Sequence, residues 1–445
     1  MSALVRWFDD RRRANALNRG MVCMSVQPRT EVDRTAAVRS VGIRARARYR
    51  RTVAALVAGA LAGLAALAGA GGAAAAPDPF YAHGPGDKPL GSIIAIEPLS
   101  APAVAKKVSG VRAYRMLYVT SDVHGGRDVA SASFFVPSTT PKNGKRALIG
   151  IGVADESLGV YCRPTSSLAR NNALDSYRNS GPVDSASKAL AAGHAVLVAD
   201  LANDGGTAPT STLVPRYDGT ALLDGLRAAL KVKNSGLNSN TTIGIYGPSG
   251  GGSQAAAVAA EIGSEYAPEL KIPSIMIGQI VPDHRNFIKQ NNGKVGSGFA
   301  FADLLGLEVA HPEMRINEKL TPIGRQIADA FRTGCTIPTD MSLGFVPLET
   351  LFKPGHSPYA DPDFQAAFAK SALATPSSPT PTAALRMTRC TDNLSPVSVT
   401  PVDDLAKAAK NYKAAGANVD TRTVDCLATI GDPYGPDLEW LLARV

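Results

Sequence analysis

Four continuous runs of apolar residues place the strongest constraint on how this chain can fold. Runs of this kind, with no polar alternation and with loops on either side, are typical of strands buried on both faces of a parallel sheet. They are Arg146–Val153, His194–Leu201, Thr242–Tyr246 and Pro273–Val281. Helix-length segments separate them, so the sequence predicts repeated βα units: a mostly parallel central sheet with helices on both faces.

The same alternation extends along the chain and is interrupted once. Residues 282–371 contain helix-like segments and no buried strand, and a polar, proline-rich link, Thr375–Thr382, follows them. We therefore divide the chain into an N-terminal extension (1–75), the first part of an α/β core (76–281), a helical insertion (282–374) and the rest of the core (375–445). The further strands are predicted at Val111–Thr120, Asp128–Pro137, Ala383–Thr388 and Ala417–Val424, and the helices at Ser185–Ala192, Gly219–Val232, Gly251–Ile262, Asp403–Ala415 and Asp437–Arg444.

The net positive charge of the chain is confined to its N-terminal extension. Residues 1–51 hold 13 arginines and four acidic residues, whereas the remaining 34 basic and 34 acidic residues cancel. An uncharged run rich in Ala, Leu and Gly follows and ends in small residues, which is the layout of a secretory signal peptide cleaved near Ala75. An uncleaved membrane anchor is the alternative. We expect a secreted or cell-envelope protein with no nucleic-acid partner.

Export bears on the cysteines. Four of them follow the extension: Cys162, Cys335, Cys390 and Cys426. An even number in an oxidising compartment indicates two disulfides, for which three pairings are possible; buried free thiols are the alternative. No group of residues has metal-ligand spacing, so we expect no metal and no cofactor.

The segment most informative about chemistry is Thr241–Gly263. It reads as a buried strand, then the turn Gly-Pro-Ser-Gly-Gly centred on Ser249, then an Ala-rich helix. A G-x-S-x-G pattern means little alone, but on a tight strand-to-helix turn it exposes the serine as a nucleophile. The helix N-terminus beginning at Gly250 directs amide groups toward a developing oxyanion. A structural glycine-rich turn or a phosphate-binding loop is the alternative.

A nucleophilic serine needs a carboxylate and a histidine, which in this arrangement follow it in that order along the chain. The carboxylate belongs after a late strand, and Asp392 follows the strand predicted at Ala383–Thr388. Asp403 and Asp404 are the alternatives, but they fit better as the N-cap and first turn of the next helix.

On these features the chain resembles the secretory lipases of the fungal lipase A type and their bacterial relatives. The resemblance covers about 77–445. It rests on the Gly-Pro-Ser-Gly-Gly turn, on Asp155 ahead of the run Cys162–Thr165, on the Thr-Asp-Asn-Leu-Ser-Pro-Val turn that holds Asp392, and on the C-terminal layout from Gly416 to Trp440.

The resemblance implies an α/β-hydrolase fold and the hydrolysis of fatty-acyl esters such as acylglycerols through an acyl-enzyme at Ser249. It also implies that residues 282–374 form a cap over the acyl pocket, and that Asp155 and the amide of Gly250 form the oxyanion hole. The disulfides it implies are Cys162–Cys335 and Cys390–Cys426. We expect a monomer whose partners are lipid or small ester substrates and, transiently, a lipid interface.

The chain departs from this family at one position. The family places its histidine between the last strand and the final helix, near Thr429 or Ile430 here, and the segment 425–436 contains none. All six histidines precede Asp392. The general base is therefore unassigned by sequence, and a histidine of the insertion is an alternative source.

Three hypotheses remain: an active esterase or lipase with an unusual base, a catalytically impaired relative that binds acyl esters, and an envelope interaction protein that keeps only the fold. An abandoned site would also have lost its glycines, so the intact turn favours a recent loss of the histidine.

Overall fold

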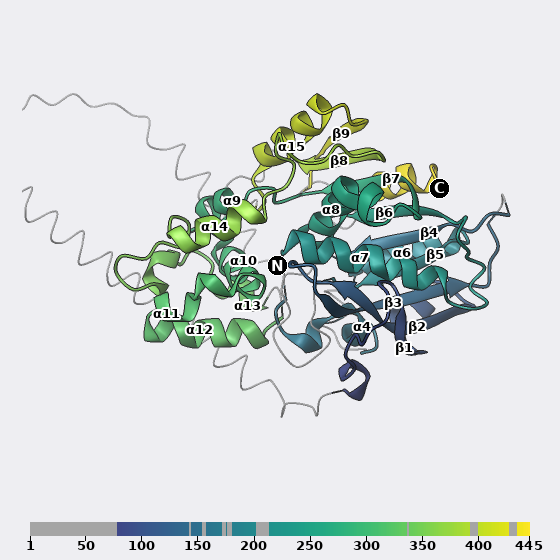
Figure 1. The fold of residues 1–445 in the computed structure, drawn as a ribbon, viewed down its shortest axis with the longest axis horizontal. Helices are drawn as coiled ribbons and strands as arrows, with labels where there is room; N and C mark the ends of the chain where they lie inside the picture. Colours follow the sequence, from purple (N-terminus) through teal and green to yellow (C-terminus); the bar gives the residue numbers. More distant parts are fainter. Residues whose placement is uncertain are drawn as a thin grey trace, which may run out of the picture. The chain divides into compact units, whose positions relative to one another are not determined.

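A computed structural model of the chain describes residues 78–141, 144–153, 157–170, 175, 180–201, 213–335, 338–391, 399–426 and 434–445. A nine-stranded sheet in the order β1-β2-β3-β5-β4-β6-β7-β8-β9 runs through this described part (Figure 1). Its strands are β1 (Ile93–Pro98), β2 (Val111–Ser121), β3 (Arg127–Pro137), β4 (Leu148–Gly152), β5 (Ala195–Ala199), β6 (Thr242–Gly247), β7 (Lys271–Gly278), β8 (Ala384–Cys390) and β9 (Val419–Val424).

The sheet is antiparallel at one end and parallel over the rest. β1, β2, β3 and β5 pair antiparallel in that order, whereas β5, β4, β6, β7, β8 and β9 pair parallel. Every residue of β4 and β5 is buried, as expected of strands covered on both faces. The predicted mostly parallel sheet is therefore confirmed.

Helices cover both faces of this sheet. Both α6 and α7 pack on β3, β4 and β5 but make no extensive contact with each other, because they lie on opposite faces of these strands. α8 lies beside α7, and α16 lies beside α6. The predicted α/β architecture is confirmed by this layering. The helices and 3-10 turns outside the insertion are η1 (Pro79–Tyr81), α3 (Pro102–Ala105), η2 (Val160–Cys162), α4 (Pro164–Ser167), α6 (Ser180–Ala191), α7 (Pro215–Leu230), α8 (Gly250–Tyr266), α15 (Val402–Ala414) and α16 (Gly435–Leu442).

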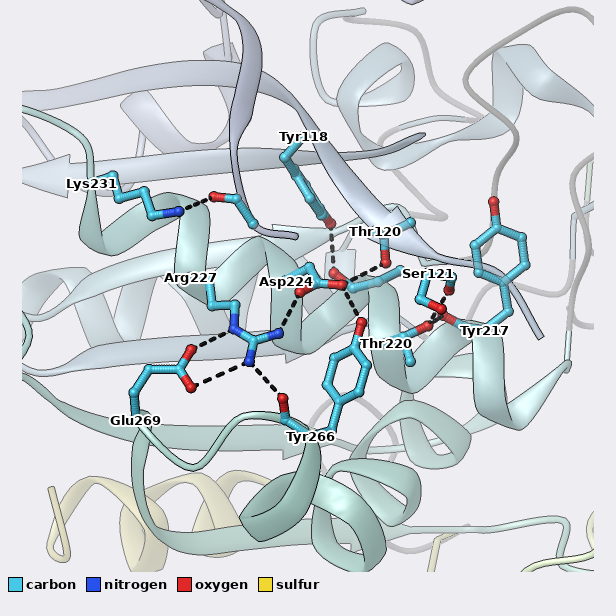
Figure 2. Close-up of polar contacts among 12 residues, drawn as sticks. Tyr118, Thr120, Ser121, Tyr217, Thr220, Asp224, Arg227, Lys231, Tyr266 and Glu269 are labelled. Atoms are coloured by element: carbon cyan, nitrogen blue, oxygen red, sulfur yellow. Dashed lines mark hydrogen bonds and ion pairs between the residues drawn. The ribbon is translucent and has the colours of Figure 1, made fainter. Parts of the chain in front are cut away.

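A buried carboxylate on α7 joins this helix to its neighbours (Figure 2). Asp224 is fully buried and accepts hydrogen bonds from Thr120 Oγ1 on β2 at 3.0 Å and from the Tyr266 hydroxyl at the end of α8 at 2.7 Å. Arg227, one helical turn further, donates to the same carboxylate at 2.8 Å and also reaches Glu269. Because a buried carboxylate is stable only with such partners, this network fixes α7 between β2 and α8.

The chain between β7 and β8 is helical and has its own apolar core. The Leu373 amide donates to the Pro282 carbonyl at 3.1 Å, so this segment leaves and re-enters the sheet at one place. Its core includes Phe301, Phe331 and Phe364, which are separate from the cluster around the sheet. The segment holds α9 (His284–Asn291), α10 (Ser297–Ala310), η3 (Pro312–Met314), α11 (Ile316–Lys319), α12 (Pro322–Thr333), α13 (Pro338–Met341), η4 (Leu348–Leu351) and α14 (Pro362–Lys370) (Figure 1).

Two features near the start of the described chain were not predicted. β1 is an edge strand whose residues are half-buried or exposed, so it lacks the apolar run that marks the inner strands. Phe80 and Tyr81 are buried in a small cluster with Leu117 and Val129, although the segment around them reads as a proline- and glycine-rich lead. Among the described residues, no helix is both long and apolar enough to cross a membrane.

Candidate active site

Ser249 lies at the junction of β6 and α8, as the sequence predicts. It is the N-cap of α8 and is partly exposed. Its backbone is extended, with φ −170° and ψ 173°, and the left-handed conformation of the turn falls instead on Gly250, with φ +51°. A residue without Cβ adopts this conformation without strain, so the sharp bend beside the serine is made by glycine. Within the described part of the chain, Ser249 Oγ has no hydrogen-bond partner.

Glycines let α8 approach the sheet closely at this point. A Cβ on Gly247 would lie 2.2 Å from the carbonyl oxygen of Gly252, and a Cβ on Gly252 would lie 2.2 Å from that of Gly152 at the end of β4. The Gly252 amide donates to the Val153 carbonyl at 2.8 Å. The carboxyl end of β4 is therefore in contact with the first turn of the helix that Ser249 caps.

This contact bears on the expected oxyanion hole. The first amides of a helix have no acceptor within it. Here the amide of Gly252 donates to Val153, whereas those of Gly250 and Gly251 donate to none of the described residues. Asp155 follows β4 by three residues and lies outside the described residues, as do Asp392, Thr429 and Ile430. Their roles stay predictions, and so does that of the Gly250 amide.

The strands that precede these residues end at one edge of the sheet. β6, β7, β8 and β9 are consecutive and parallel, so the segments that follow them meet there. Adjacent strands lie about 4.8 Å apart, which puts the end of β8 roughly 10 Å from the end of β6. Asp392 follows β8 and the segment that lacks a histidine follows β9, so the topology allows both to approach Ser249.

The backbone is strained at the same edge. Leu201, which follows β5, has φ +60°, and Gln279, which follows β7, has φ +46°. Gln279 Nε2 donates to Cys390 Sγ at 2.9 Å, and its Oε1 accepts from the Cys390 amide at 3.3 Å. Left-handed residues other than glycine persist where their surroundings hold them, and they cluster at functional sites.

Two disulfides connect segments at this edge. Cys390 at the end of β8 is bonded to Cys426 after β9, and Cys162 in η2 is bonded to Cys335 of the insertion. The Gly159 amide also donates to the Gly334 carbonyl at 3.1 Å, beside the second of these bonds. These are the pairings that the family resemblance implies.

Asp403 and Asp404, the alternatives to Asp392 as the catalytic carboxylate, lie on the helix that follows. Asp403 and Asp404 lie in the first turn of α15, whose N-cap is Pro401 and neither aspartate, so that detail of the prediction was wrong. Asp404 accepts from Asn286 Nδ2 of α9 at 2.8 and 2.7 Å, and burial raises its pKa. Asp404 therefore links α15 to the insertion.

The structure adds a histidine–carboxylate pair that the sequence analysis did not identify. His284, the first residue of α9, places Nδ1 2.9 and 3.1 Å from the two carboxylate oxygens of Asp303 on α10, and both side chains are fully buried. Burial raises the pKa of Asp303, and the imidazole opposes that shift. The available signal was a single acidic residue in the apolar run 298–307, but no sequence pattern pairs it with His284.

The match to known proteins agrees with this geometry. A model of the secretory lipase family matches residues 183–442. The chain belongs to the secretory lipase family. It is 31% identical over 265 residues to a secreted triacylglycerol lipase of Malassezia furfur, which covers 58% of this chain and 54% of that protein. The chain thus spans about half the length of that relative.

A second relative carries a name that describes it as inactive. A protein of Mycobacterium tuberculosis named a probable inactive lipase is 27% identical over 312 residues, which is 69% of this chain and 67% of that protein. Among solved structures, lipase A of Candida antarctica in its closed state superposes with a TM-score of 0.70 at 20% identity, over 78% of this chain and 80% of that one. At this identity the likeness shows the α/β-hydrolase fold alone.

The expectation that the protein binds no metal ion can be compared with the arrangement of the described side chains. No group of three or more His, Cys, Asp or Glu side chains in the described ranges is arranged to hold one. The expected absence of a cofactor remains a prediction.

Proposed function

We propose that this member of the secretory lipase family is an exported serine carboxylesterase that cleaves fatty-acyl esters through an acyl-enzyme at Ser249. The observation that carries the proposal is the strand–turn–helix junction at the carboxyl edge of the sheet. The serine is partly exposed there and its hydroxyl makes no hydrogen bond to the described residues. The first amides of α8 follow it in the chain and would stabilise the oxyanion formed when Oγ adds to an ester carbonyl.

The remaining roles follow the family pattern. Asp155 would complete the oxyanion hole with the Gly250 amide, and Asp392 would supply the carboxylate. Residues 282–374 would cap the acyl pocket and contact a lipid interface. The N-terminal extension would direct export and be cleaved near Ala75, giving a monomeric mature protein; N-terminal sequencing of the exported protein tests this.

The absent C-terminal histidine lowers the expected turnover. A serine site that loses one member of its triad retains only about 10³–10⁴-fold acceleration over water, from the oxyanion hole and substrate binding. Impaired hydrolysis with retained acyl-ester binding is thus the second candidate, favoured by the relative whose name describes it as a probable inactive lipase.

The test is covalent labelling by a fluorophosphonate ester that carries a long alkyl chain. Because phosphonylation requires an activated hydroxyl, we expect slow, saturable labelling of the full chain and none of Ser249→Ala. Hydrolysis of p-nitrophenyl esters of increasing chain length would then define the acyl preference. Saturable binding of a fluorescent fatty-acyl ester without labelling would support the second candidate and exclude the first.

Restoring a histidine at the expected position gives a second, independent arm. We expect Ile430→His or Thr429→His to raise the rate of labelling and of ester hydrolysis, by about 10²–10⁴-fold if no other residue acts as the base and by less if one already does. The gain must vanish when Ser249→Ala is added. If neither variant gains activity and the wild-type chain is not labelled, the serine-hydrolase proposal is wrong.

A further inference from the structure

The buried pair His284–Asp303 has the form of the base half of a catalytic triad. Nδ1 of His284 faces the carboxylate of Asp303 at 2.9 and 3.1 Å, so a carboxylate accepts the Nδ1 proton and Nε2 keeps its lone pair. The imidazole also stacks on Phe368 of α14, with ring centroids 6.5 Å apart and planes inclined by 15°. The tautomer and the ring orientation are therefore both set by neighbouring side chains.

The second ring nitrogen has no partner. His284 Nε2 is buried and makes no hydrogen bond to the described residues, although the side chain is 0% exposed. A buried polar atom left in this state costs about 1–3 kcal/mol, and in native proteins such atoms call for a specific explanation, among them a catalytic role. A purely structural histidine at this position would be expected to use both nitrogens.

His284 also lies on the segment that passes the nucleophile. A Cβ on Gly278, the last residue of β7, would lie 2.3 Å from the carbonyl oxygen of Pro248, the residue before Ser249. Gln254, in the second turn of α8, donates from Nε2 to the Val281 carbonyl at 2.8 Å. The chain then reaches Asp283, which caps α9 by accepting from the Asn286 amide at 3.0 Å and so fixes His284 as its first helical residue.

The other histidines are less suited to the same role. His194 lies at the amino end of β5, away from the edge that carries Ser249, and its Nδ1 accepts from the Ala147 amide at 3.2 Å. His83 precedes β1 and His124 lies between β2 and β3, and both are exposed.

Two further histidines lie in the insertion. Nε2 of His311 faces Ser371 Oγ at 3.3 Å; its Nδ1 is also buried without a hydrogen bond to the described residues, but its nearest carboxylate oxygen, on the exposed Glu313, is 3.5 Å away, so no buried carboxylate orients this ring. His356 is paired with Asp361, but that carboxylate also binds the ammonium of Lys319 at 2.7 Å and is therefore shared.

We propose that His284, oriented by Asp303, is the general base for Ser249 and takes the place of the absent C-terminal histidine; this rests on the function proposed above. In acylation Oγ bonds to the ester carbonyl carbon as its proton passes to His284 Nε2, and the imidazolium returns that proton to the alkoxide as the ester C–O bond breaks. In deacylation water gives its proton to Nε2 while its oxygen attacks the acyl carbon, and the imidazolium reprotonates Oγ as the bond between Oγ and the acyl carbon breaks and the fatty acid leaves. The two groups are not hydrogen-bonded in the ligand-free chain, and such contacts commonly tighten, or are bridged by one water, when substrate binds.

The test compares identical substitutions at two buried histidines. We expect His284→Asn to lower both the rate of fluorophosphonate labelling and kcat/KM for a p-nitrophenyl ester by about 10²–10⁴-fold, and to remove the acid limb of the pH–rate profile. His194→Asn, at the amino end of β5 and away from Ser249, is the control and should change neither. Asp303→Asn should reduce kcat with little change in KM, because it alters the tautomer and leaves the acyl site in place.

A rescue variant separates loss of the base from loss of the fold. We expect the double variant His284→Asn/Ile430→His to recover labelling, since a histidine at the family position supplies a base in place of His284. Wild-type labelling that His284→Asn leaves unchanged would overturn the role of His284 while the function proposed for Ser249 stands. If the wild-type chain is not labelled but its Ile430→His variant is, the role of His284 is also overturned. If neither is labelled, it is the serine-hydrolase proposal itself that fails.

Discussion

The contact between α8 and β4 permits a prediction whose sign reverses along a single helix. Gly252 and Gly263 both lie in α8, but a Cβ on Gly252 would meet backbone atoms of Gly152 at 2.2 and 2.4 Å and of Val153 at 2.9 Å, whereas a Cβ on Gly263 would meet nothing within 4 Å. Replacing each by alanine therefore makes the same chemical change in two opposite environments.

The expected free energies of unfolding follow from these distances. Alanine gains about 0.5–1 kcal/mol over glycine inside a helix, and this gain should appear unopposed in Gly263→Ala. In Gly252→Ala the methyl group meets backbone, which cannot rotate away, and overpacking of this kind costs about 1–3 kcal/mol. We expect a net loss of roughly 1–2 kcal/mol for Gly252→Ala, together with a weaker bond from its amide to the Val153 carbonyl.

Equilibrium unfolding in urea measures both variants, and fluorophosphonate labelling measures the consequence at Ser249. Displacing the first turn of α8 from β4 moves the amides beside the serine, and a shift of about 1 Å can lower a rate by about 10²-fold. If Gly252→Ala were as stable as the wild-type chain, the close approach of α8 to β4 would not exist in solution. If it were less stable but labelled at the wild-type rate, this contact would not position the oxyanion amides.

Three further outcomes are expected. Asp224→Ala should lower the free energy of unfolding by about 3–5 kcal/mol, because it leaves buried donors without their acceptor. Glu269→Ala, at the exposed end of the same network (Figure 2), should lower it by less than about 1 kcal/mol, and equal losses in urea unfolding would contradict the different burial of the two carboxylates. Burial lowers the pKa of His194, so as the pH falls the unfolded chain binds a proton on this imidazole before the folded chain does. The contribution of His194 to stability should therefore be complete above pH 6.5 and decrease below it. His194→Gln should reduce this dependence of the unfolding free energy on pH, measured from about pH 5 to 8. Replacing both Cys390 and Cys426 by serine should lower the free energy of unfolding by up to about 4 kcal/mol, because the disulfide closes a loop of 36 residues in the unfolded chain. A thermal midpoint that falls no more than it does for a conservative surface substitution would contradict this.

Most of the sheet could be predicted from the sequence because its inner strands are buried on both faces. β4, β5 and β6 have almost no exposed residue, so burial alone selects the apolar runs from which they were inferred. The edge strand β1 lacks that signal, since its partial exposure permits polar residues and a terminal proline. Secondary structure was thus predictable where both faces are covered. Partial exposure removed that signal from β1, although the largely exposed strand β9 was predicted at Ala417–Val424.

The candidate site was predictable only where chemistry and backbone geometry coincide in a short segment. Ser249 and its glycines are contiguous, so one motif predicts both the nucleophile and the bend beside it, and the structure shows that bend. His284 and Asp303 lie 19 residues apart on different helices, and only the packing of α9 against α10 brings them together. Interactions of that kind depend on tertiary structure that no local pattern encodes.

The structure also changes what the intact glycines mean. Gly247 and Gly252 allow α8 to pack on the sheet, so the fold requires them whether or not Ser249 reacts. Their presence does not favour a recent loss of activity, contrary to the inference drawn from sequence. The residues on either side of the segment after β9 are likewise held by contacts that the fold uses. Cys426 is fixed by its disulfide, and Asp437 accepts a hydrogen bond from Arg422 at 2.8 Å, so neither position depends on a catalytic histidine.

Groups that the fold does not require are therefore more informative about catalysis. The backbone of Ser249 is extended, a conformation open to any residue, and its hydroxyl bonds to none of the described residues. His284 Nε2 is buried and also makes no hydrogen bond to the described residues. Packing explains neither atom, whereas transfer of a proton from the first to the second gives both a role. Variants at these two positions should consequently change reaction rates far more than they change stability, and that separation distinguishes an active enzyme from a retained fold.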